Sequence, residues 1–252
     1  MEKINKYLIS IYKRLSVLLK NKNVEKKLFI ILIVLVISLS LFPRSIEVLN
    51  QNPVFGFDQG RDMLAVKNIV VNHKFTLIGA ELGAGFAGLS GLFHGPMYYY
   101  FLTLPFILFN GDPVGGTWLM LAFGLSAIAI GYLLGKSLFN NTTGIIIALL
   151  MSVSPTFIYQ SRFIWFSYPT TPFILLSFLF TYLFTKNKSN LFILLASFFA
   201  GFVYNFEFAI AIPLCLTLFL YSICIFKKKI TKYLFLFIGF ILAFSPLIIF
   251  EF

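Results

Sequence analysis

Apolar runs of bilayer-spanning length dominate this chain and restrict it to one class of protein. A helix needs about 20 apolar residues to cross the hydrocarbon core of a membrane. Charged residues make up only 12% of the chain, which excludes a soluble domain, because such domains carry about 25%. We therefore expect an all-α membrane protein with about seven transmembrane helices. The candidate spans are about 28–45, 116–135, 144–161, 168–185, 190–206, 208–226 and 232–250.

The net charge of +11 does not indicate a nucleic-acid partner, because no soluble surface exists to carry a basic patch. It instead predicts how the chain is oriented in the membrane. Fifteen of the 20 Lys and Arg residues lie at the N-terminus or in the loops after the second, fourth and sixth predicted spans. Basic loops stay on the cytoplasmic side. We therefore predict an integral protein of the bacterial plasma membrane with a cytoplasmic N-terminus. The five cations on the outer side would be Arg44, Arg61, Lys67, Lys74 and Arg162.

The first 27 residues are predicted to be a separate segment. They hold eight Lys and Arg residues, and their apolar residues recur at nearly helical spacing. This pattern favours a basic amphipathic helix on anionic membrane lipids, and a solvated basic tail is the alternative. The transmembrane module would then be 28–252. Its first span is slightly short, and Lys27 and Arg44 could complete it by reaching to the interface.

The segment 46–115 is predicted to be a long outer loop of juxtamembrane helices, since it is too apolar for a linker and too interrupted for a span. Residues 97–109 are too few to cross the membrane, and a crossing there would place the later basic loops outside. We expect a surface or re-entrant helix instead. The apolar run 191–226 is too long for one span and should fold back at 204–207.

An acidic motif, Phe57-Asp58-Gln59-Gly60-Arg61-Asp62, lies in the outer loop soon after the first span. Asp58 and Asp62 are four residues apart, so both carboxylates share a face if the stretch is helical. Asp58 is the candidate catalytic base, which would accept a proton from an acceptor hydroxyl. The compatible structural interpretation is that Asp58 caps the helix. Arg61 and Asp62 are candidate substrate-binding residues.

Three further residues on the predicted outer side are candidates for substrate binding. His94 could relay a proton or bind a phosphate, or be structural. Arg162 follows a long apolar segment and could grip a lipid phosphate with two nitrogens, or reach to the headgroups. Glu207 interrupts an apolar run, and a salt bridge to Arg162 is its structural alternative. The sequence contains no set of metal ligands at a recognisable spacing, so no cofactor is expected, although a divalent metal stays possible.

Three motifs follow one another in an order that resembles a known superfamily. They are the acidic motif at 57–62, the segment His94-Gly95-Pro96-Met97-Tyr98-Tyr99-Tyr100, and Ser154-Pro155 followed by Ser161-Arg162-Phe163-Ile164-Trp165. The order resembles the GT-C integral-membrane glycosyltransferases, in particular the bacterial branch related to protein O-mannosyltransferases and aminoarabinose transferases. In that branch the second motif reads H-P-P-L-x-Y. The likeness covers about residues 28–250.

This resemblance implies an enzyme that moves a sugar, a hexose or pentose type, from a polyprenyl-phosphate donor to a lipid, glycan or protein at the outer face. Asp58 occupies the position of the family's catalytic or acceptor-binding Asp. The family often has Asp-Glu there, whereas this chain has Asp58-Gln59. A second acid common after the third span is missing from 165–167, which argues against a bound metal. Glu207 could take its place.

Two other functions fit a polytopic chain of this kind. A transporter or flippase would need ionisable residues near the middle of the membrane, whereas here they gather at one face. A non-catalytic subunit for lipid-linked glycans would tolerate loss of Asp58. Relatives in the resembling family continue with more helices, so we expect the 252 residues to be an N-terminal module or truncated copy that is inactive alone.

Overall fold

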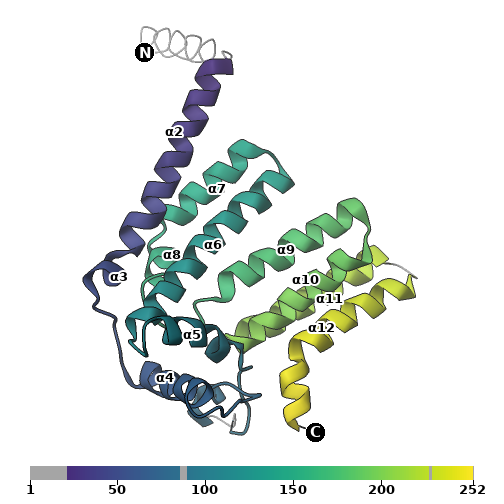
Figure 1. Ribbon diagram of the computed structural model, residues 1–252. Helices are drawn as coiled ribbons and strands as arrows, with labels where there is room; N and C mark the ends of the chain where they lie inside the picture. The colour runs from purple at the N-terminus through teal and green to yellow at the C-terminus, as the bar shows by residue number, and fades with distance from the viewer. Residues whose placement is uncertain (1–21, 86–89, 227–228, 252) are drawn as a thin grey trace, which may run out of the picture.

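Long helices run between two ends of the molecule, and shorter helices gather at one of these ends (Figure 1). The computed structural model describes residues 22–85, 90–226 and 229–251. Within these ranges there is no strand, and one isolated β-bridge joins Glu81 to Phe93. The long helices are α2 (Lys22–Leu41), α6 (Val114–Leu138), α7 (Asn141–Val153), α9 (Thr170–Asn187), α10 (Asn190–Phe202), α11 (Phe208–Phe226) and α12 (Ile230–Glu251).

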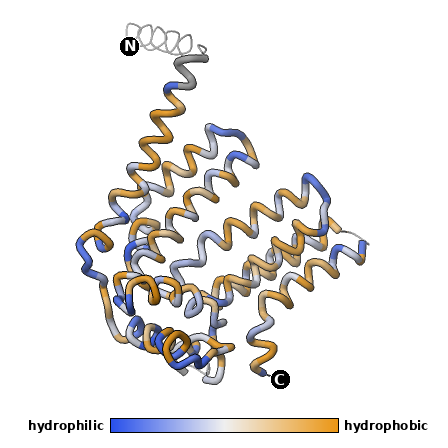
Figure 2. Tube along the Cα trace, in the orientation of Figure 1, coloured by the Kyte–Doolittle hydropathy of each residue, from blue (hydrophilic) through white to orange (hydrophobic). Residues whose placement is uncertain are grey.

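Among the described residues, four segments are long and apolar enough to cross a membrane, which confirms an all-α membrane protein. They are Lys27–Arg44, Val114–Leu138, Phe208–Phe226 and Ile230–Glu251. Apolar residues cover the helices, and hydrophilic residues gather at the turns between them (Figure 2). The number of about seven spans stays a prediction, because α7 and α10 have only 13 residues each.

The basic turns that the structure describes lie at one end of the molecule. In Figure 1 the start of α2 is at the top, the turn between α6 and α7 lies in the upper half, and the turn between α9 and α10 is at the upper right. The start of α12 lies near that last turn. The opposite end carries α3 (Ile46–Asn50), α4 (Phe57–Val70) and α5 (Met97–Leu108). We call these the basic end and the α3–α5 end. The arrangement agrees with the predicted separation of basic loops from a helical outer loop.

Two local predictions at the α3–α5 end are confirmed. α5 has 12 residues, about 18 Å of helix, and lies across this end without spanning the molecule (Figure 1). The long apolar run folds back where predicted: α10 ends in the short 3-10 helix η3 (Val203–Asn205), and α11 begins at Phe208. The chain therefore returns to the α3–α5 end between α10 and α11, which brings 203–207 next to the loop before α5.

One predicted span is wrong in its extent. The segment 144–161 is not a single helix, because it breaks at Ser154 into α7 and α8 (Pro155–Gln160). Ser154 has an extended backbone, φ −65° and ψ 122°, as expected before a proline. Pro155 then starts α8, where its missing N–H costs nothing. This break turns the chain sideways at the α3–α5 end.

Arg44 also differs from its prediction. Its side chain does not reach out to the interface but is fully buried at the end of η1 (Phe42–Arg44). The guanidinium donates to the carbonyl oxygens of Met151 and Ser152, both at 2.9 Å, at the end of α7. It also donates to Ser40 O at 3.2 Å and to Ser161 Oγ at 3.2 Å. A buried cation thus joins the C-terminal ends of α2 and α7, where helix dipoles favour positive charge.

Small residues and aromatic rings pack the rest of the bundle. A Cβ on Gly239 of α12 would collide with Ser197 Oγ and Leu194 O of α10, so the glycine permits the close crossing of these two helices. On the inner side of the α3–α5 end, Phe206 is fully buried and stacks on Phe173 with ring centroids 5.1 Å apart. This aromatic layer supports the segments that carry the polar residues described next.

Candidate functional site

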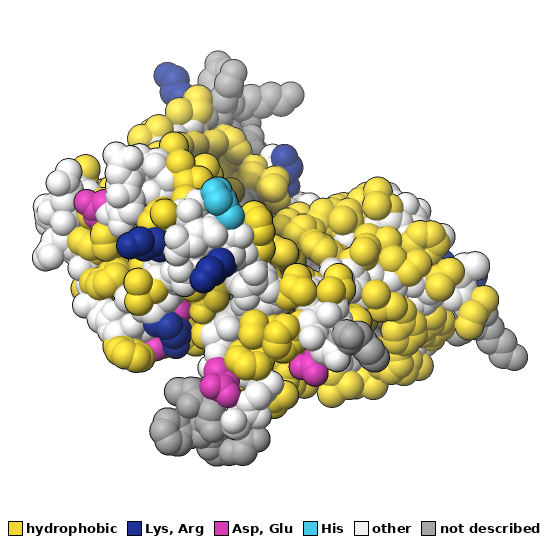
Figure 3. Space-filling view, turned by 60° about the horizontal axis from the view of Figure 1, so that its bottom comes forward, with side chains coloured by type: hydrophobic (Ala, Val, Ile, Leu, Met, Phe, Trp, Pro, Cys, Tyr) yellow, Lys and Arg dark blue, Asp and Glu magenta, His cyan; other side chains and the backbone are white. Residues whose placement is uncertain are grey.

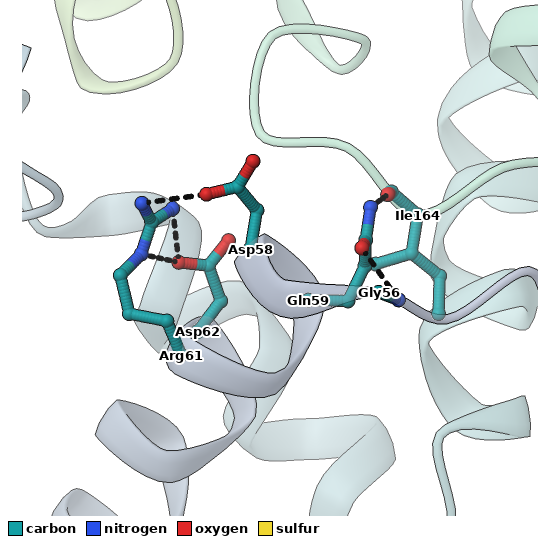
Figure 4. A network of polar contacts seen from close by, with 6 residues as sticks. All are labelled: Gly56, Asp58, Gln59, Arg61, Asp62 and Ile164. Carbon is teal, nitrogen blue, oxygen red and sulfur yellow. Dashed lines mark hydrogen bonds and ion pairs between the residues drawn. The ribbon is translucent and has the colours of Figure 1, made fainter. Parts of the chain in front are cut away.

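The acidic motif forms the first turns of α4. The helix begins at Gly56, and Gln59 Oε1 accepts a hydrogen bond from Gly56 N at 2.9 Å. The interpretation of Asp58 as the helix cap is therefore wrong: Asp58 lies in the first turn, where a negative charge is favoured. Gln59 also donates to Ile164 O at 2.8 Å, which ties α4 to the segment after α8 (Figure 4). Gln59, which stands where the resembling family often has Glu, thus donates a hydrogen bond that holds α4 in place.

Asp58 and Asp62 do share one face of α4, and Arg61 bridges them (Figure 4). Arg61 donates to Asp58 Oδ1 at 3.0 Å, and to Asp62 Oδ1 through two nitrogens at 2.9 and 2.8 Å. The Asp58 side chain is 39% exposed, whereas that of Asp62 is 4% exposed. Asp58 is therefore the carboxylate that a substrate can reach. The buried Asp62 orients Arg61 from the interior of the protein.

Burial and the ion pair shift the pKa values of Asp62 and Arg61. Burial raises the pKa of Asp62, and Arg61 opposes that effect through its hydrogen bond and its charge. Burial also acts to lower the pKa of Arg61, but the hydrogen bond and charge of Asp62 outweigh it, so the Arg61 pKa is raised. Arg61 is thus firmly cationic and holds Asp58 in place from the side.

His94 lies on the inner side of the loop before α5. It is buried, and its ring is 4.9 Å from the ring of Phe166 between centroids. Burial lowers the pKa of His94 to about 4, while the Tyr204 backbone acts in the opposite direction and the charge of Arg61 adds to the lowering. His94 is therefore neutral at physiological pH and cannot hold a phosphate by charge. A structural or positioning role fits this environment better.

Arg162 pairs with an acid that the sequence analysis missed. Arg162 Nε donates to Glu47 Oε2 at 2.6 Å, and Nη2 donates to Glu47 Oε1. Glu47 belongs to α3 and is buried, whereas Arg162 is 26% exposed. The suggested pairing of Arg162 with Glu207 is wrong. The signal available in the sequence was an acid directly after the first span, three residues beyond Arg44.

Glu207 lies at the start of α11. Its carbonyl accepts from Ala211 N at 3.1 Å, and its side-chain Oε1 accepts from Ala209 N at 3.4 Å. A carboxylate in this position caps the helix and is favoured by its dipole. Glu207 is half-buried, so its side chain is still accessible from the α3–α5 end.

The polar motifs converge although they are far apart in the chain. One small cavity is lined by residues from α4, the loop before α5, α5 itself, the segment after α8, and η3; they are Asp62, Gly79, Ala80, His94, Gly95, Tyr98, Tyr99, Phe166 and Asn205. Tyr204 Oη donates to Phe93 O, and Asn205 Oδ1 accepts from Met97 N at 3.3 Å. A Cβ on Gly95 would collide with Asn205 Oδ1, so only glycine permits this contact.

The α3–α5 end presents a mixed surface. In Figure 3, Lys, Arg, Asp, Glu and His side chains are scattered over this end, and the helical body beside it is almost entirely hydrophobic. In the residues that the structure describes, no three His, Cys, Asp or Glu side chains gather closely enough to hold a metal ion. A polar face above an apolar body suits a substrate with a charged head and a long apolar tail.

Comparison with known proteins gives one match. The family model described as dolichyl-phosphate-mannose-protein mannosyltransferase matches residues 93–250, more than half of the chain. The matched range begins at the loop that carries His94 and includes Arg162 and Glu207, and α4 with Asp58 precedes it. Searches of curated proteins and of solved structures found no match.

Proposed function

The chain belongs to the dolichyl-phosphate-mannose-protein mannosyltransferase family of the GT-C superfamily, and from this premise we propose that it moves a sugar from a polyprenyl-phosphate donor to a lipid, glycan or protein. Its family makes it a membrane glycosyltransferase. The observation that carries the proposal is the convergence at the α3–α5 end of the acidic motif, the His94 loop and the segment that carries Arg162. Charged donor heads and acceptors meet there, at the boundary of the apolar bundle.

In the proposed reaction, the exposed Asp58 carboxylate accepts the proton of an acceptor hydroxyl. The acceptor oxygen forms a bond to the anomeric carbon of the sugar from the opposite side, so the configuration inverts. The bond from that carbon to the phosphate oxygen breaks, and polyprenyl phosphate leaves with the electron pair. Negative charge grows on the phosphate during this step, so a nearby cation stabilises the transition state more than the ground state.

Arg162 is the cation that we assign to the donor phosphate. It lies at the edge of the bundle, and Glu47 occupies only its Nε and Nη2, so Nη1 is the nitrogen that the pair with Glu47 does not use. The ion pair fixes the guanidinium plane before the donor arrives, which lowers the entropy lost on binding. Arg61 adds positive charge beside Asp58.

We predict that Arg162→Lys and Arg162→Ala both weaken donor binding, with Arg162→Lys keeping the charge but losing the planar two-nitrogen grip. Binding of a labelled polyprenyl-phosphate sugar to the protein in nanodiscs measures this. The matched control is Glu47→Gln, which weakens the ion pair but keeps the guanidinium. Unchanged affinity in both Arg162 variants, or an equal loss in Glu47→Gln, would refute the phosphate assignment.

We further propose that the α3–α5 end faces outward in a bacterial plasma membrane and that the N-terminus is cytoplasmic. The support is the position of the basic turns at the opposite end. Single cysteines at 58 and 188, in a protein without Cys215 and Cys224, can be labelled in intact cells. An impermeant reagent should label position 58 and spare position 188; labelling of 188 alone would reverse the orientation.

A further inference from the structure

The cavity behind the acidic motif contains two buried polar atoms whose bonding the fold does not complete. Among the described residues, neither His94 Nδ1 nor Tyr98 Oη has a hydrogen-bond partner. His94 is 6% exposed and Tyr98 is 3% exposed, so bulk water cannot satisfy either atom. A buried polar group without a partner costs about 1–3 kcal/mol, and native proteins rarely keep two of them side by side.

Both residues line the same cavity as Asp62, and its size limits what it can hold. The cavity has a volume of about 10 Å³. A single buried water needs about 10–15 Å³ on this measure and two to four polar partners. A sugar ring or a phosphate is far too large for it. Asp62 lines the cavity and the exposed Asp58 does not, so the acceptor is not expected to enter it.

We propose that this cavity is a binding site for one structural water, which joins His94, Tyr98 and Asp62. The water would accept a hydrogen bond from Tyr98 Oη and donate one each to His94 Nδ1 and to an oxygen of Asp62. Both Arg61 bonds go to Asp62 Oδ1. The Tyr99 hydroxyl is a further hydrogen-bond partner of this carboxylate, whose two oxygens together keep a lone pair for the water. The water then gives each of the three side chains the hydrogen-bond donor or acceptor that it lacks.

The neutral state of His94 supports this arrangement. A neutral imidazole keeps one nitrogen as an acceptor, whereas a protonated ring would present two donors. The charged groups that face His94 are Arg61 and Asp62 from α4, and Tyr98 and Tyr99 of α5 are the neighbouring titratable groups. Arg61 disfavours a second cation at this place.

The water gives His94 and Tyr98 a role in the reaction, and this part rests on the proposed function. The water holds Asp62, Asp62 holds Arg61, and Arg61 holds Asp58. His94 and Tyr98 are therefore positioning residues for the catalytic acid, although neither touches the substrate. This chain of contacts also explains why a buried histidine lies in the loop directly before α5.

The sign of one stability change tests the water site without any assay of function. If Tyr98 Oη is satisfied by a water, Tyr98→Phe removes a hydrogen bond and should lower the Tm in detergent by about 2–4 °C. If the hydroxyl has no partner, the same change removes an unsatisfied group, and the Tm should stay or rise. An unchanged or higher Tm would overturn the proposal.

A double-mutant cycle tests whether the water joins Tyr98 to Asp62. Tyr98→Phe and Asp62→Asn should change the Tm by less together than the sum of the single changes. The matched control is Tyr100→Phe on the same helix, because Tyr100 Oη donates directly to Thr76 O at 2.9 Å. The control should lower the Tm and add fully to Asp62→Asn. Full additivity for Tyr98→Phe as well would overturn the bridge.

His94 offers a second test if Asp62→Asn does not fold. His94→Asn keeps an acceptor near the position of Nδ1, whereas His94→Val removes it. We expect the Asn variant to retain the coupling with Tyr98→Phe and the Val variant to lose it. Equal behaviour of the two variants would contradict the role of Nδ1.

Kinetics then separate this inference from the proposed function. In an active transferase, Tyr98→Phe should lower kcat several-fold and leave the KM for the donor unchanged. His94→Asn should retain more activity than His94→Val. If the stability coupling is present but no transfer is detected from any lipid-linked donor, the water site stands and the proposed function fails. If transfer occurs but kcat is unaffected, the positioning role fails.

Discussion

Replacing Asp58 by asparagine is expected to lower sugar transfer by about 10²- to 10⁴-fold, which is the contribution of a general base. The asparagine keeps the size of the side chain and can still accept a hydrogen bond from Arg61, so the fold should survive. What it cannot do is take the acceptor proton. The measurement is the initial rate of transfer by the natural protein in proteoliposomes, with the Tm of each variant recorded beside it.

The control for Asp58→Asn is the same substitution at Asp112. Asp112 is an exposed acid of the same loop, and its Oδ1 accepts from Val114 N at 2.8 Å, a role that asparagine also performs. Asp112→Asn should transfer at the normal rate. Asp62→Asn should lower the rate less than Asp58→Asn, because Asp62 is buried and acts through Arg61. A normal rate in Asp58→Asn would show that another group is the base.

Replacing Arg44 by alanine is expected to cause the largest loss of stability. The change removes the bonds to Ser40 O, Met151 O, Ser152 O and Ser161 Oγ and leaves a cavity among buried groups. Hydrogen bonds to a charged group contribute about 1.5–3 kcal/mol each, and leaving a buried acceptor without a partner costs about 1–3 kcal/mol. A loss of at least about 3 kcal/mol corresponds to a decrease of about 6–12 °C in the Tm.

Thermal unfolding in detergent checks the Arg44 prediction. Lys74→Ala is the control, because Lys74 is an exposed cation at the same end of the molecule and should leave the Tm within about 1 °C of the wild type. Arg44→Lys should fall between the two, since an ammonium reaches fewer carbonyl oxygens than a guanidinium. If Arg44→Ala has the same Tm as the wild type, the buried cation does not hold α2 against α7.

The features that the sequence predicted correctly are those that length and apolarity determine. An apolar run of 36 residues has no stable arrangement except a turn, and the turn occurs at the polar residues of 203–207. The helix α5 is too short to span, and the structure places it across the α3–α5 end. The shared face of Asp58 and Asp62 follows from helical spacing alone.

The features that were missed depend on contacts between distant parts of the chain. Glu47 and Arg162 are 115 residues apart, and the position of Glu47 directly after the first span marks an unusual acid without indicating its partner. Arg44 was expected at the interface because the first span is slightly short and a long cationic side chain could complete it. The structure instead buries Arg44, and carbonyl oxygens at the end of α7 accept its hydrogen bonds. The break at Ser154 is different, since Pro155 was a local signal for it.

We propose above that the protein uses a sugar attached to polyprenyl phosphate, at the α3–α5 end. The most direct measurement uses the natural protein in proteoliposomes with a panel of labelled polyprenyl-phosphate sugars and, in parallel, the matching nucleotide sugars. We expect that label leaves a polyprenyl-phosphate donor, that free polyprenyl phosphate appears in equal amount, and that Asp58→Asn lowers both by about 10²- to 10⁴-fold. Transfer from a nucleotide sugar with none from any lipid-linked donor would contradict this proposal.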